Sequence, residues 1–235
     1  EQGLEAYEYQ CGKGVTVGEA TARAIGRAAA GAGIALSLHA PYFISLSNPD
    51  PEMRRKTVGY ITTSCLAARW MGATRVVIHT GALLKRTRRQ ALDIAKETLR
   101  QAMTVCDDQG FGDITLCPET MGKINQLGDL DEVLELCQLD GRLLPCIDFG
   151  HLYARSLGAD DGAEVFARML DKVESGRALP QPLLPHRVHP QGGREVPPDL
   201  CRPRGLWTGL GAPGGGSGPP GLEPHLHLRE RRHPG

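Results

Sequence analysis

Hydrophobic residues in the first three quarters of the chain form two kinds of segment. Short runs that are apolar throughout alternate with longer segments in which apolar residues recur every three or four positions. The short runs predict strands at residues 3–10, 34–40, 75–81, 113–120 and 143–150. The longer segments predict helices at residues 17–32, 51–72, 88–110, 130–139 and 161–173. Strands that are apolar on both faces and alternate with amphipathic helices are typical of a parallel sheet.

Residue types that bind metal ions stand at the ends of the last four predicted strands. These residues are His39 in LSLHAPY, His79 in VVIHTG, Glu119 in ITLCPET, and Asp148 and His151 in CIDFGHLYA. In a β/α barrel the carboxyl ends of the strands surround a common axis and carry the active site. The pattern therefore predicts an α/β fold of the TIM-type (β/α)8 class with a metal site at one end.

Five β/α units can be recognised in the chain, which predicts a truncated barrel. The sequence opens on a strand-like segment without an initiating methionine, so we expect the first unit to be missing. The 235 residues, 40% of them hydrophobic, suffice for one ordinary core. We assign residues 1–175 to the partial barrel and residues 176–235 to an irregular Pro/Gly-rich tail, since 12 of the 17 prolines follow residue 179.

Charge gives little support to non-specific nucleic-acid binding. Residues 1–176 carry 19 Lys and Arg against 23 Asp and Glu, whereas such binding needs a basic surface. A local exception follows the His79 motif and consists of Lys85, Arg86, Arg88 and Arg89. These residues are candidates for substrate binding through phosphate contacts, and they are equally compatible with the solvated start of a helix.

Neither the cysteines nor the hydropathy indicates export or insertion into a membrane. The seven cysteines form no CxxC pair, and several lie in apolar runs where cysteine acts as a small hydrophobic residue. No apolar stretch approaches the roughly 20 residues that a membrane span needs. We expect a soluble, cytoplasmic monomer.

The motifs HAPY, VIHTG, PET and IDFGH, in this order at strand ends, resemble those of the endonuclease IV family. That family comprises apurinic/apyrimidinic endonucleases, metal-dependent DNA-repair enzymes of the xylose-isomerase-like TIM barrel superfamily that cut DNA at abasic sites. The resemblance covers about residues 3–175. It implies that His39, His79 and Glu119 bind a first metal ion, that Glu119 bridges to a second held by Asp148, and that His151 binds a third.

The residue types favour the same chemistry independently of the resemblance. Imidazole and carboxylate suit Zn²⁺ or Mn²⁺, and two such ions can activate water for in-line attack on phosphorus. Glu119, as the bridging carboxylate, is the predicted catalytic residue. Any one of the five residues taken singly could be a core histidine or a capping acid, but the set of five favours a metal site. The resemblance implies two or three zinc ions in the intact parent.

The tail has two interpretations. If its codons are read one base later, residues 179–189, 195–202 and 225–234 can encode segments that resemble the later motifs of the family. We favour such a frameshift between about residues 172 and 179. A genuine disordered tail would have a similar composition.

Two other functions compete with a phosphodiester hydrolase. A xylose-isomerase-like sugar isomerase or epimerase would place similar ligands on the same face of the barrel and act on a small sugar. The acidic body favours this alternative slightly, whereas the Lys85–Arg89 cluster favours DNA. The third possibility is an inactive fragment that aggregates through exposed sheet edges.

Overall fold

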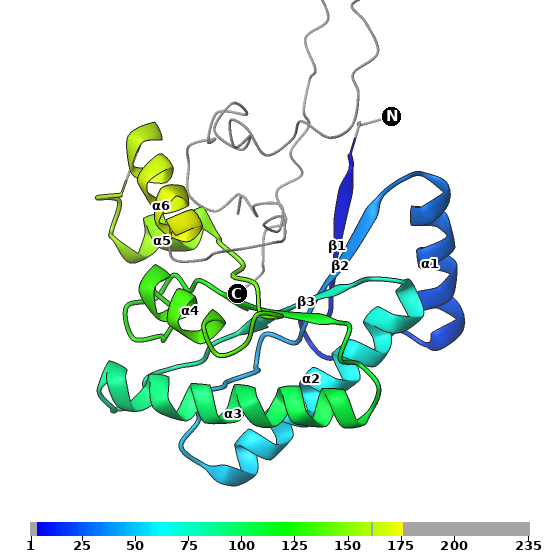
Figure 1. Cartoon of the computed structure of the whole chain (residues 1–235), viewed down its shortest axis with the longest axis horizontal. Helices are drawn as coiled ribbons and strands as arrows, with labels where there is room; N and C mark the ends of the chain where they lie inside the picture. The colour runs from blue at the N-terminus through cyan, green and yellow to red at the C-terminus, as the bar shows by residue number, and fades with distance from the viewer. Residues whose placement is uncertain (1–3, 161, 176–235) are drawn as a thin grey trace, which may run out of the picture. The chain divides into compact units, whose positions relative to one another are not determined.

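The computed structural model describes residues 4–160 and 162–175, and the predicted tail lies outside these residues. Within them, strands and helices alternate for most of the chain (Figure 1). The elements are β1 (Ala6–Gln10), α1 (Glu19–Gly31), β2 (Ala35–His39), α2 (Pro51–Met71), β3 (Arg75–His79), α3 (Arg88–Asp108), β4 (Thr115–Glu119), α4 (Leu130–Cys137), α5 (Phe149–Arg155) and α6 (Ala163–Ser175).

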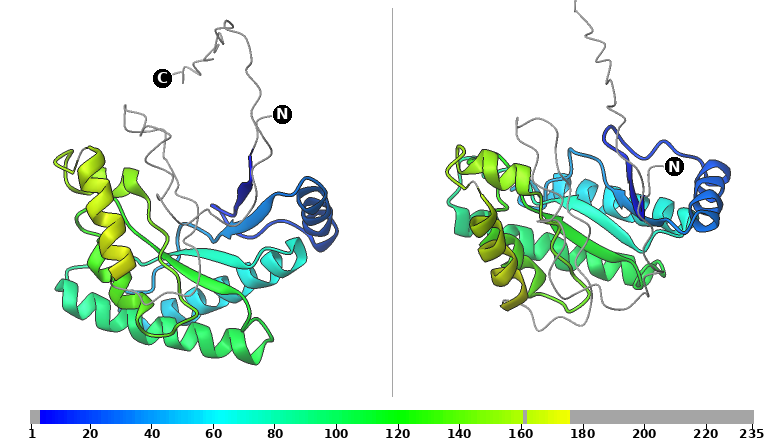
Figure 2. Two further views of the ribbon diagram at one scale, coloured as in Figure 1. Left: turned by 45° about the horizontal axis from the view of Figure 1, so that its top comes forward. Right: turned by 90° about the horizontal axis from the view of Figure 1, so that it is seen from above.

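The strands form one parallel sheet in the order β1-β2-β3-β4. Each strand therefore pairs with its neighbours in the sequence, and His79 at the end of β3 lies opposite Glu119 at the end of β4. Successive helices from α1 to α4 contact one another, and Figure 2 shows α2 and α3 along one side of the sheet. Sequential parallel strands covered by their connecting helices are the repeating unit of a TIM barrel, so the predicted fold class is confirmed.

Strand side chains alternate between a helix-covered face and an opposite face. Val76 belongs to the large core cluster formed with the helices, whereas Val77 and Cys117 belong to a separate small cluster. Because successive side chains in a strand point to opposite faces, His79 and Glu119, each two residues further on, share the second face. In a closed barrel this face is the interior.

Local signals explain where the helices begin and end. Asp50 precedes α2 and its carboxylate accepts a hydrogen bond from the backbone N–H of Glu52 at 2.8 Å, with Pro51 in the first turn. Gly72 ends the same helix in the left-handed conformation, with φ of 71°. Caps of this kind are legible in the sequence, and the five predicted helices begin and end within two residues of the observed bounds.

The predicted fifth strand at residues 143–150 is confirmed only in part. In the described structure the segment runs parallel to β4, with a bridge between Cys146 and Glu119 and backbone hydrogen bonds from Leu144 and Cys146 to β4, but residues 149 and 150 already belong to α5. Pro145 has no backbone N–H to give to a sheet. Asp148 accepts a hydrogen bond from the backbone N–H of His151 at 2.8 Å and so starts a helix that we did not predict.

Candidate metal centre

His39, His79 and Glu119 are the last residues of β2, β3 and β4. Their potential ligand atoms all lie within 4.8 Å of one another. The three strands are adjacent in the sheet and end together, and each places its final side chain on the face away from the helices. The sequence thus places two imidazoles and a carboxylate at one point through strand length and alternation alone.

The two imidazoles are held in the same way. Nδ1 of His39 lies 2.7 Å from the carbonyl oxygen of Ala40, and Nδ1 of His79 lies 2.8 Å from that of Tyr42. A carbonyl oxygen can only accept, so each Nδ1 carries a proton and donates it. In the neutral ring, Nε2 then keeps its lone pair, the tautomer used by histidines that bind metal through Nε2.

Both Nε2 atoms face the same carboxylate oxygen. Glu119 Oε2 lies 3.1 Å from His39 Nε2 and 3.2 Å from His79 Nε2. Burial raises the pKa of Glu119, but when the two imidazoles are protonated their Nε2–H groups donate to Glu119, outweigh burial and hold the pKa below its usual range. For His39, burial lowers the pKa, and the hydrogen bond and charge of Glu119 outweigh this and raise it. The carboxylate of Glu119, which is fully buried, is therefore ionised.

A second group shares Glu119 and adds Asp148 and His151. His151 Nδ1 lies 3.9 Å from Glu119 Oε1 and 3.6 Å from Asp148 Oδ2. The same Nδ1 donates to the carbonyl oxygen of Thr120 at 2.8 Å. Glu119 thus faces two histidines through one oxygen and a third histidine through the other. All five predicted ligands come together.

The donor set fits a divalent cation. Neutral imidazole nitrogens and carboxylate oxygens are the ligands that Zn²⁺ and Mn²⁺ accept. Two Nε2 lone pairs directed at one ionised oxygen repel one another unless a proton or a cation lies between them. His39, His79 and Glu119 would hold one ion, and Glu119 with Asp148 and His151 would contribute to a neighbouring one.

The predicted basic cluster is divided by the structure. Arg88 forms ion pairs with Asp129 and Glu132 at the start of α4, at 3.2 and 2.5 Å, and Arg89 pairs with Glu135 at 2.9 Å. These two side chains tie α3 to α4. Lys85 and Arg86 lie in the loop before α3, where Lys85 is exposed and has a left-handed backbone with φ of 64°. A role for these two residues in substrate binding stays a prediction.

Sequence reasoning missed an aromatic group beside the centre. Tyr42 and Phe43 follow the His39 motif and are 61% and 42% exposed. Phe43 stacks edge-on against Tyr42 and against Tyr60 of α2, with ring centroids 5.7 and 4.8 Å apart. The signal was available, since Tyr42 and Phe43 are adjacent aromatic residues in the loop that follows the end of β2, and such loops often carry binding residues. Through its carbonyl oxygen, Tyr42 also orients His79.

The profile of the xylose isomerase-like TIM barrel family matches residues 1–182. The chain belongs to this family. A relative from Methanocaldococcus jannaschii of uncharacterised function is 33% identical over 172 residues, which are 73% of this chain and 61% of the relative. A protein of Acholeplasma laidlawii named probable endonuclease 4 is 32% identical over 122 residues, or 49% of this chain and 40% of that protein. The resemblance to endonuclease IV is thereby confirmed, and the chain spans less than two thirds of either relative's length.

Solved structures of two enzyme classes share the fold. Endonuclease IV from Thermus thermophilus matches with a TM-score of 0.57 and 21% identity over 74% of this chain and 62% of its own. A D-psicose 3-epimerase studied in the presence of D-fructose matches with a TM-score of 0.58 and 16% identity over 82% and 68%. At these identities the likeness establishes the fold alone. None of the helices in the described part of the chain is long and apolar enough to cross a membrane.

Proposed function

We propose that this family member is a metal-dependent phosphodiester hydrolase of the endonuclease IV type that cleaves DNA at abasic sites. The observation that carries the proposal is that Glu119 belongs to both groups of potential metal ligands. One of its oxygens faces His39 and His79 at 3.1 and 3.2 Å, and Glu119 also forms a second group with Asp148 and His151 whose potential ligand atoms lie within 4.8 Å of one another. A carboxylate so placed can bridge two cations, the arrangement used in two-metal phosphodiester hydrolysis.

The residues of this chain have distinct parts in that proposal. His39, His79 and the ionised Glu119 would hold one cation, whose chemistry is to polarise a phosphoryl oxygen and to lower the pKa of water. Asp148 and His151 extend the site along the edge of the sheet toward α5. The exposed rings of Tyr42 and Phe43 offer flat apolar surfaces on which nucleobases can stack once a damaged nucleotide leaves the duplex.

A sugar isomerase or epimerase is the second candidate, and the ion pairs of α3 favour it. Arg88 and Arg89 were half of the cation cluster that favoured DNA, and both bind carboxylates of α4 instead. Residues 1–176 also carry four more acidic than basic side chains, from 23 against 19. A small neutral ketose needs no basic surface, and a buried carboxylate such as Glu119 could move a proton between its carbons.

Incubation with a duplex that contains one abasic site separates the two candidates. Because the chain spans only part of its relatives, we expect activity from a form in which codons beyond about residue 172 are returned to the alternative frame and the expected first β/α unit is added, and none from the printed chain. With Zn²⁺ or Mn²⁺ that form should nick the strand on the 5′ side of the lesion. Turnover of a keto-sugar without nicking would move the assignment to the isomerase class.

Glu119→Gln is the matched variant for this assay. The amide keeps the side-chain volume but loses the charge that a bridge between cations requires, so nicking should be abolished while the circular dichroism spectrum is unchanged. Glu97→Gln, on the exposed surface of α3, is the control and should leave nicking unchanged. Nicking that survives Glu119→Gln would contradict the proposed role.

A further inference from the structure

Two cysteine side chains meet in the core, away from the metal centre. Cys65 on α2 and Cys106 on α3 lie with their Sγ atoms 3.8 Å apart, although 41 residues separate them in the sequence. A disulfide bond is about 2.0 Å long, so a movement of about 2 Å would join the two sulfur atoms. Cys106 lines a pocket together with Leu116 near the start of β4, whereas the metal centre lies at the end of that strand.

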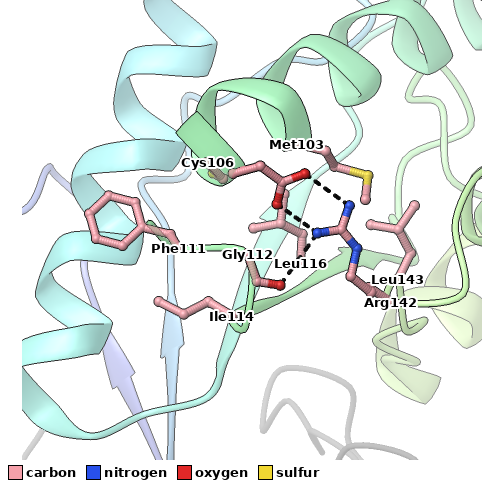
Figure 3. A pocket seen from close by; sticks show the side chains of 9 residues that line it. Met103, Cys106, Phe111, Gly112, Ile114, Leu116, Arg142 and Leu143 are labelled. Carbon is pink, nitrogen blue, oxygen red and sulfur yellow. Dashed lines mark hydrogen bonds and ion pairs between the residues drawn. The ribbon is translucent and has the colours of Figure 1, made fainter. Parts of the chain in front are cut away.

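The two thiols differ in their access to solvent. Cys65 is completely buried, whereas Cys106 lines a surface pocket together with Asp107, Gly112 and Arg142. Figure 3 shows this pocket, with the Arg142 guanidinium bound to Asp107 and to the carbonyl oxygen of Gly112. Its free volume is about 10 Å³, room for one water-sized molecule. This pocket is the route by which a small reagent would reach Cys106, which is 4% exposed, whereas Cys65 is not among the residues that line it.

The surroundings also distinguish the two thiols chemically. The hydrogen bond from Cys65 lowers the pKa of Cys106, and the positive charge of Arg142 acts in the same direction, against burial and Asp107. The hydrogen bond to Cys106, together with burial, raises the pKa of Cys65. The thiolate is the reactive form of cysteine, and Cys106, which lines the pocket beside Arg142, is the thiol placed to act as the nucleophile.

We propose that Cys65 and Cys106 form a redox-active dithiol that small peroxides oxidise to a disulfide between α2 and α3. The Cys106 sulfur attacks one oxygen of hydrogen peroxide, the O–O bond breaks, and the other oxygen leaves as water, which gives a sulfenic acid. The Cys65 sulfur then attacks the Cys106 sulfur, the S–O bond breaks, and a second water leaves with the Cys65 proton. The two thiols lose two electrons, and the peroxide gains them.

The proposal is tested by peptide mass spectrometry of the full chain. The reduced protein is treated with hydrogen peroxide, its remaining thiols are alkylated in denaturant, and the digest is searched for a Cys65–Cys106 linked peptide that has lost two hydrogen atoms. We expect this link to form first among all cysteine pairs and to disappear after treatment with dithiothreitol. The same reaction in unfolded protein should give no preference for the pair.

Two variants identify the order of attack. Cys65→Ser should accumulate a sulfenic acid on Cys106, which a 1,3-dione reagent traps, because the resolving thiol is missing. Cys106→Ser should leave Cys65 reduced, since no other route leads to it. Cys137→Ala, a similarly buried cysteine of α4, is the control and should retain the link. Native wild-type protein whose Cys65 and Cys106 stay reduced while other cysteines oxidise would overturn the proposal, as would oxidation of Cys65 in Cys106→Ser.

Discussion

Two threonines beside the candidate ligands connect the strand ends of the metal centre to later parts of the chain through hydrogen bonds. Thr80 and Thr120 come directly after His79 and Glu119, and both are fully buried. Thr80 Oγ1 donates to the carbonyl oxygen of Leu127 at 2.6 Å, and Thr120 Oγ1 accepts from the backbone N–H of Asp148 at 2.8 Å. Each threonine thus connects the end of β3 or β4, the strands that carry His79 and Glu119, to a later segment of the chain.

Thr120→Val should destabilise the protein by about 1–3 kcal/mol, because the isosteric side chain leaves the buried N–H of Asp148 without its acceptor. Thr120→Ser, which keeps the hydroxyl, should recover most of the loss. Urea unfolding followed by circular dichroism measures both. A Thr120→Val midpoint equal to that of the wild type would show that this hydrogen bond does not hold Asp148 in place.

At the level of residues, the sequence predicted which candidate ligands would gather at the strand ends but not the residues that support them. His39, His79 and Glu119 were legible because each ends an apolar run, and the ends of parallel strands meet. Thr120 and Tyr42 were not legible, because their roles depend on partners 28 and 37 residues away in the sequence. Such contacts exist only after the sheet has formed.

Between elements, Arg88 is a structural tie from α3 to α4. Its guanidinium donates to both carboxylate oxygens of Glu132, which is buried, and to the carbonyl oxygen of Ile124 at 3.1 Å. Glu132 Oε2 also accepts from the backbone N–H of Gly128 at 2.7 Å. These contacts hold the loop that leaves Glu119.

Arg88→Ala should therefore destabilise the protein by about 2–3 kcal/mol, since it leaves a buried carboxylate without its cation. Arg89→Ala is the matched control, because its side chain is 67% exposed and surface pairs contribute at most about 1 kcal/mol. Thermal unfolding of the two variants side by side gives the comparison. Equal losses would mean that Arg88 is an ordinary surface charge and would return it to the candidates for substrate binding.

Helix α1 meets the end of α2 at a glycine. A Cβ atom at Gly26 would clash with the backbone carbonyl oxygen of Met71, whereas one at Gly59, on the exposed side of α2, would meet nothing within 4 Å. Gly26→Ala should destabilise the protein by about 1–3 kcal/mol or more, because the helix must move. Gly59→Ala should stabilise it by about 0.5–1 kcal/mol. Chemical denaturation of both checks the opposite signs, and a stabilising Gly26→Ala would contradict the close packing.

The predicted fifth strand shows where the end of an element was misplaced, because its last two residues begin α5. LLPCIDFG is apolar enough for a buried strand, but a short apolar run has no periodicity that distinguishes the end of a strand from the first turn of a helix. Asp148 serves as the helix cap, so the motif that places His151 is a helix start rather than an extension of the strand.

For the molecule as a whole, the alternation of strands and helices predicted the parallel sheet and its sequential order. Each helical segment is long enough to serve as the crossover connection between two parallel strands. Because such connections usually join neighbouring strands, few strand orders other than the sequential one are expected. The number of β/α units in the functional protein does not follow from this alternation. It depends on the tail, which lies outside the described residues. The frameshift therefore stays a prediction, and the nucleotide sequence around codons 170–182 checks it.

Titration of the metal-free protein with Zn²⁺, followed by calorimetry, tests the central claim that three strand ends form a metal centre. We predict about one ion per chain, bound weakly because the set of three protein ligands is open. His39→Ala and His79→Ala should each abolish this binding, while Glu97→Gln leaves it unchanged. Folded wild-type protein that binds no zinc, or binding that survives loss of both histidines, would contradict the account.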